Sequence, residues 1–189
     1  MVSLWLTTAV HAEVIDRIVA VVNGHIFTLG DLRQERETRA HLGEKQLDND
    51  ENLAREMIDT YLIEQQIADS PDIDVTDSDV DEELQKLNVR PDAVTDVLRY
   101  ALRLRIRIQK FFDMRFRQAI RPTDDEIRKY YEEVFVPEAR RRGLQSIPPL
   151  TESSMVSAIR ENVIQENLDH EVEVWLEAIR RKSNVEILQ

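Results

Sequence analysis

The sequence predicts a mainly α-helical fold that carries a small antiparallel sheet. Two observations indicate the helices: the chain of 189 residues contains only four glycines, and residues 96–121 have helical periodicity without Gly or Pro. A third observation indicates the sheet. Asn23-Gly24 is the strongest short hairpin signal, and residues 185–188 alternate like a half-buried strand. Because a lone hairpin is marginal in water, we expect the C-terminal strand to pair with it.

Composition and charge argue against several classes of function. The net charge of −12 argues against nucleic-acid binding, which needs clustered positive charge. The chain has no cysteine and its four histidines are far apart, so we expect no disulfide, no thiol nucleophile, no metal site and no cofactor. No segment approaches the roughly 18 apolar residues that span a bilayer, so we expect no stable membrane insertion.

The first twelve residues are typical of the end of a secretory signal peptide. A short apolar run is followed by Val10-His11-Ala12, which suits signal peptidase before Glu13. The charged region that normally begins such a signal is missing. Either the start codon lies upstream of Met1, or the segment is simply an unstructured N-terminus. We favour export, and therefore expect a periplasmic protein.

Three helix starts follow from capping signals. Residues 18–22 and 25–27 form the predicted hairpin, after which Thr28 and Asp31 predict an N-terminal capping box. Residues 52–69 carry apolar side chains at helical spacing and stop before Pro71. Thr76 and Thr123 each precede an acidic first turn, which predicts two further helices.

The segment 96–121 is the predicted central helix. One side forms a basic stripe of Arg99, Arg103, Arg107, Lys110, Arg117 and Arg121. We expect this stripe either to be solvated or to be neutralised by acidic helices of the same chain. More than half of the remaining circumference is apolar, wider than a helix packed on one side requires. Either neighbouring helices clasp it on two sides, or part of the apolar arc stays open as a groove for another polypeptide.

Two further segments complete the chain. Residues 136–150 contain Gly143 and Pro148-Pro149, which predicts a connection after a helix that ends at residue 135. Residues 154–182 form the last predicted helix, whose apolar face changes near Val163. This helix must either contact two different surfaces or bend.

Both ends of the chain resemble one protein family. The hairpin sequence RIVAVVNG at 17–24, followed by Ile26, Thr28, Asp31 and Leu32, resembles the N-terminal domain of the SurA family of periplasmic chaperones. Residues 173–182, EVWLEAIRRK, and the strand 184–188 resemble the elements that close the SurA core. The resemblance implies a helical chaperone domain like that of SurA and trigger factor. It divides the chain into a core at 13–135, a linker at 136–150 and a completing segment at 151–189.

In the family, a parvulin-type prolyl isomerase domain occupies the place of the linker, so its absence implies that this chain is no isomerase. No nucleotide-binding loop, nucleophile elbow or zinc-protease motif is present either, and we expect no enzyme. The resemblance implies binding of unfolded outer-membrane or secreted polypeptides without ATP. The candidate peptide-binding residues are Tyr100, Phe111, Phe112, Met114 and Phe116. Because clustered aromatic side chains usually fill cores, the alternative for each of these residues is that it packs in the core and binds no peptide. The alternative function is a dedicated partner of one envelope protein, or a homodimer.

Overall fold

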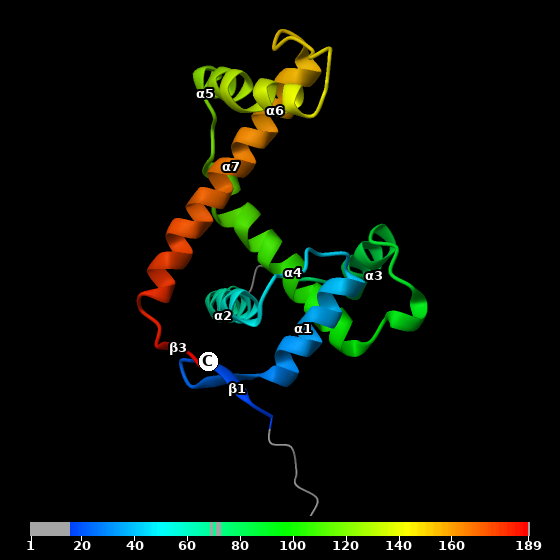
Figure 1. The fold of residues 1–189 in the computed structure, drawn as a ribbon, viewed down its shortest axis with the longest axis vertical. Helices are drawn as coiled ribbons and strands as arrows, with labels where there is room; N and C mark the ends of the chain where they lie inside the picture. Colours follow the sequence, from blue (N-terminus) through cyan, green and yellow to red (C-terminus); the bar gives the residue numbers. More distant parts are fainter. Residues whose placement is uncertain (1–15, 69, 71–72, 189) are drawn as a thin grey trace, which may run out of the picture.

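The computed structural model describes residues 16–68, 70 and 73–188 (Figure 1). The predicted signal remnant at 1–12 lies outside these residues. The described chain is mainly helical with one three-stranded antiparallel sheet, as the sequence predicts. In this part of the chain no helix has both the length and the apolar character needed to cross a bilayer.

The sheet joins the two ends of the chain. Its strands are β1 (Ile18–Val22), β2 (His25–Thr28) and β3 (Val185–Ile187), in the order β2-β1-β3. Asn23 and Gly24 both have positive φ, 50° and 84°, which is the backbone of the tight turn that the Asn-Gly pair predicts. The backbone N–H of Asn23 also donates to the Asn184 carbonyl at 2.9 Å. The predicted pairing of the C-terminal strand with the N-terminal hairpin is therefore confirmed.

The bounds of the helices are α1 (Leu29–His41), α2 (Asp50–Ile67), α3 (Asp77–Lys86), α4 (Asp96–Arg115), α5 (Asp124–Tyr130), α6 (Val136–Arg141) and α7 (Ser153–Arg180). Helices α1 to α5 each begin after a residue whose side chain caps the first turn. Full capping boxes start α1, α3 and α5, through Thr28, Thr76 and Thr123. These three local predictions are confirmed.

Two helix ends differ from the sequence-based expectation. The central helix α4 ends at Arg115 rather than at residue 121. A 3-10 turn at Arg117–Ala119 follows it, and Ile120 is extended ahead of Pro122, which disfavours helical backbone in the residue before it. The predicted connection at 136–150 begins as helix α6. Pro137 lacks the N–H that an uninterrupted helix would donate, and a wide π-helical turn, Tyr131–Phe135, carries the chain from α5 into α6.

Helix α7 packs against two separate cores. Ile159 and Val163 pack with Ile127 of α5 in a small unit, whereas Leu176 packs with Phe111 of α4 and with α2. Figure 1 shows α7 running as one continuous helix from the unit that contains α5 and α6 to the sheet. Of the two alternatives for the last helix, contact with two surfaces is the one observed.

The basic stripe of α4 meets the acidic helix α3. Arg99 donates to Asp81 at 2.6 Å, Arg103 pairs with Asp77, and Lys110 Nζ lies 3.1 Å from Asp79. Leu98 and Leu102 are buried beside these pairs, against Val80 and Leu84 of α3. Acidic residues of the same chain therefore neutralise this part of the stripe.

Candidate functional site

A second apolar stripe of α4 borders two adjoining cavities. The stripe recurs at helical spacing and consists of Val97, Tyr100, Ala101, Leu104, Ile108 and Phe112. One cavity, of about 290 Å³, lies between β2, α1, α2 and α4. The other, of about 760 Å³, lies between α2, α4 and α7. Thr60, Arg105 and Ile108 line both, so the two cavities adjoin along α4, and we name the pair of cavities the α4 groove.

The groove has an apolar base and partly exposed apolar walls. Ile63 of α2 and Leu168 of α7 are buried at its base. Val97 and Tyr100 are 44% and 58% exposed at the end near α1. The two volumes fall within or near the range of protein ligand sites. Polar and charged side chains contribute eight of the thirteen residues that line the larger cavity, so its walls mix apolar and polar groups. Part of the apolar arc of α4 therefore borders these cavities, and whether another polypeptide binds there stays a prediction.

An ion-pair network fixes the middle of the groove. Arg105 of α4 donates from Nε to Glu44 at 2.5 Å and from Nη2 to Glu35 of α1 at 2.8 Å. Arg39 of α1 also donates to Glu35, at 3.1 Å, and pairs with Glu56 of α2. Burial opposes the charge of Arg105, but the carboxylates of Glu44 and Glu35 raise its pKa above the ordinary value. The network joins three helices, so this part of the groove is already shaped before a ligand arrives.

A second link between α2 and α4 lies at the exposed end of the groove. The Tyr100 hydroxyl donates to Glu64 Oε1 at 2.8 Å. This hydrogen bond, together with burial, raises the pKa of the Tyr100 hydroxyl. Tyr100 therefore presents its ring to the groove while its hydroxyl is held by α2.

Beyond the groove, α4 ends in an aromatic cluster. Phe111, Phe112 and Phe116 lie with Trp175 of α7, with ring centroids 5.6 to 6.5 Å apart. The Arg115 guanidinium lies 5.4 Å from the centroid of the Phe116 ring, within cation–π range. This cluster holds α4 against α7.

The five predicted peptide-binding residues divide between groove, core and surface. Tyr100 and Phe112 line the groove. Phe111 is only 4% exposed and belongs to the core, and half-buried Phe116 packs in the aromatic cluster. Met114 is exposed but borders neither cavity of the groove.

Sequence reasoning missed the aliphatic members of the site. Leu104 and Ile108 belong to the apolar arc of the predicted central helix, but the aromatic residues were preferred as candidates. Tyr61 of α2, which stacks on His25 with ring centroids 4.4 Å apart, also lines the groove. No local pattern in the sequence predicts that α2 lies beside α4. The helical spacing of Leu104 and Ile108 is the one sequence signal that could have placed them in the groove.

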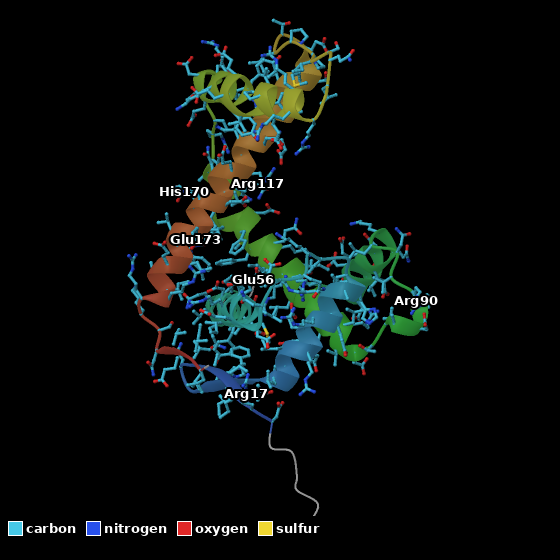
Figure 2. All side chains as sticks on the ribbon, viewed as in Figure 1. Arg17, Glu56, Arg90, Arg117, His170 and Glu173 are labelled. Carbon is cyan, nitrogen blue, oxygen red and sulfur yellow. The ribbon has the colours of Figure 1, made fainter. Side chains whose placement is uncertain are left out.

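Figure 2 labels one residue of each cavity, Glu56 on α2 and Arg117 beyond the end of α4. Both are charged residues that border an apolar interior. Among the described residues, no group of three or more His, Asp or Glu side chains is placed to hold a metal ion. The arrangement suits non-covalent binding of a ligand that carries both apolar and polar groups.

Comparison with known proteins adds no assignment. No model of a known protein family matches this chain, and no curated protein matches it.

Proposed function

We propose that this protein is an ATP-independent periplasmic chaperone, which holds unfolded exported or outer-membrane polypeptides in the α4 groove without catalysing prolyl isomerisation. The observation that carries the proposal is the groove itself. An apolar stripe of a central helix borders two adjoining cavities of about 290 and 760 Å³, although the same helix is well packed elsewhere.

The physical basis is capture by apolar contact. Apolar and aromatic side chains in the groove would remove client side chains from water, while the net charge of −12 would keep the complex soluble. Binding should be weak, because a disordered client loses conformational freedom when it is captured. The resemblance to the SurA family at both ends of the chain supplies the client class and the periplasmic location.

Light scattering tests the proposal. An unfolded porin is diluted from denaturant with and without the protein, at low and at high salt, in the absence of ATP. We expect the protein to suppress scattering at both salt concentrations, because screening weakens exposed ion pairs and leaves apolar burial largely intact. If scattering is unchanged at a severalfold excess of protein, the proposal is wrong.

A matched pair of variants locates the activity. Val97→Ser removes an exposed apolar side chain from the groove, whereas Val134→Ser removes one of similar exposure from the turn between α5 and α6. Both should keep the wild-type unfolding midpoint, because neither side chain is buried. We expect only the Val97 variant to lose suppression, and equal loss in both would argue against the groove.

A dedicated partner of one envelope protein, or a homodimer, is the second candidate. One observation favours it: ion pairs among α1, α2 and α4 hold the groove in a set shape, whereas promiscuous binders use flexible, Met-rich surfaces. A pull-down from periplasm separates the two candidates. Many unfolded outer-membrane proteins would support the chaperone, and one stoichiometric partner would support the dedicated interaction.

A further inference from the structure

The charges around the α4 groove point to the chemistry of its ligand. We propose that the groove selects apolar segments that also carry Lys or Arg side chains, over apolar segments that are neutral or acidic. This inference rests on the proposed function, because it names the class of polypeptide that the same groove would bind.

Carboxylates outnumber cations along the groove. Seven carboxylates line the two cavities, namely Glu35, Glu44, Glu56, Glu64, Asp113, Glu161 and Asp169. Only three guanidiniums do so, those of Arg39, Arg105 and Arg117. Seven against three leaves an excess of four negative charges around an apolar interior.

The three guanidiniums are already committed to carboxylates of the groove. Arg105 contacts both Glu35 and Glu44. Arg117 pairs with Glu161 of α7, and its Nε lies 3.9 Å from Asp113. None of these cations is left to neutralise the remaining carboxylates.

In each cavity, one carboxylate is hydrogen-bonded to a neutral side chain. Among the described residues, Glu64 accepts its hydrogen bond from the Tyr100 hydroxyl, and Asp169 accepts one from the Gln165 side-chain amide at 2.7 Å. Glu64 lines the cavity beside α1, and Asp169 lines the cavity beside α7. A ligand that extends along the groove would therefore meet one such carboxylate in each cavity.

The distribution of cations on α4 makes this excess local. Arg99, Arg103 and Lys110 pair with carboxylates of α3 rather than with those of the groove. Arg107 donates to the Ile67 carbonyl at 3.2 Å, although its charge also acts on the Tyr100 hydroxyl beside Glu64. The groove side therefore keeps its negative charge although α4 itself is rich in arginine. Charge complementarity across an apolar site mainly discriminates between partners, and that is the role we infer here.

Three short labelled peptides test the selection. They share the same apolar and aromatic residues and differ only in carrying Lys, Gln or Glu at the polar positions. Fluorescence anisotropy measures the Kd of each peptide at low and at high salt. We expect the Lys peptide to bind about fivefold more tightly than the Gln peptide at low salt, from two partly exposed charge pairs, and the Glu peptide to bind most weakly. The differences should shrink at high salt.

A double variant separates local charge from net charge. Glu64→Gln combined with Asp169→Asn should remove most of the advantage of the Lys peptide. The readout is the ratio of the Kd values of the Lys and Gln peptides on the same variant, so that any general change of the groove affects both peptides. Glu132→Gln combined with Glu133→Gln removes the same charge from an exposed turn outside the groove, and should leave the advantage intact. Unfolding midpoints of both variants verify that each is folded.

The outcomes distinguish this inference from the function on which it rests. Equal Kd values for the three peptides would overturn the inference and leave the groove as a peptide site. Equal loss of the advantage in the two double variants would also overturn it, because the selection would then come from the net charge of the whole protein. Absence of binding by all three peptides would overturn the proposed function together with the inference.

Discussion

Arg180, at the end of α7, donates two hydrogen bonds to Asp59 of α2, from Nε to Oδ1 at 2.7 Å and from Nη2 to Oδ2 at 2.5 Å. Such a forked pair fixes the orientation of both side chains. The bonds to Asp59 are the main reason why the pKa of Arg180 is raised well above its ordinary value. The pair holds α7 against α2, and these two helices form walls of the α4 groove.

Loss of this pair should weaken the protein. We expect Asp59→Asn to lower the free energy of unfolding by about 2 kcal/mol, because the partly exposed Arg180 guanidinium loses its better-buried charged partner. Urea denaturation followed by circular dichroism measures the change. Glu173→Gln, which removes the more exposed partner of Arg180, is the control and should cost less than about 1 kcal/mol. Equal losses of free energy of unfolding in the two variants would show that the Asp59 pair stabilises the fold no more than the Glu173 pair does.

Phe111 and Phe112 should separate stability from binding. Phe111 is buried, so we expect Phe111→Ser to lower the free energy of unfolding by roughly 3–5 kcal/mol. Phe112 is half-buried and lines the groove, so Phe112→Ser should lower the free energy of unfolding less than Phe111→Ser does. Per folded molecule, Phe112→Ser should suppress scattering less well than Phe111→Ser. Thermal melts and light scattering on both variants test this. Equal melting points would contradict the assignment.

The last helix and strand should be required for cooperative folding. Removal of residues 154–189 deletes β3 and nearly all of α7, which contributes to two cores. We therefore expect the truncated chain to lose its cooperative unfolding transition. Removal of residues 185–189 alone should lower the midpoint and keep the transition, since α7 remains. A chain truncated at 154 that melts at the full-length midpoint would contradict this expectation.

Acid should weaken the helix caps. Hydrogen bonds from the Thr123 backbone and side chain lower the pKa of Glu126 below its ordinary value, and the Thr76 backbone does the same for Asp79. A lowered pKa stabilises the folded state above the ordinary pKa, and this contribution is lost as pH falls through the folded value. The temperature of the unfolding midpoint should therefore decrease as the pH is lowered from roughly 5 to 2. Glu126→Gln keeps the cap and should make this fall shallower, whereas an unchanged slope would exclude a contribution from Glu126.

Prolyl isomerisation should not be catalysed. The segment 136–150 consists of α6 and a short connection. Under the proposed resemblance to the SurA family, it stands in place of the parvulin domain. We expect a proline-containing tetrapeptide to isomerise in the presence of the protein at the uncatalysed rate, over tens to hundreds of seconds at 25 °C. A protease-coupled assay measures this rate, and saturable acceleration by the pure protein would refute the expectation.

Local signals in the sequence determined much of the fold. Asn23-Gly24 specified the hairpin turn, and Thr28, Thr76 and Thr123 specified three helix starts, because each depends on residues within a few positions along the chain. The pairing of β3 with β1 is long-range, yet it was predictable because the hairpin and the last strand each lacked a partner. The change of apolar face in the last helix likewise predicted its two contact surfaces.

Only the tertiary structure decided which part of the apolar arc on α4 is covered. Phe111 and Phe112 are adjacent and chemically identical, but Phe111 is buried while Phe112 lines the groove. Likewise Leu102 is buried against α3, whereas Leu104 borders the groove. Burial depends on where α2, α3 and α7 pack around the helix, and those positions are set by contacts between residues far apart in the chain. The sequence therefore determined how wide the apolar arc is, and packing determined which side of it remains accessible to a ligand.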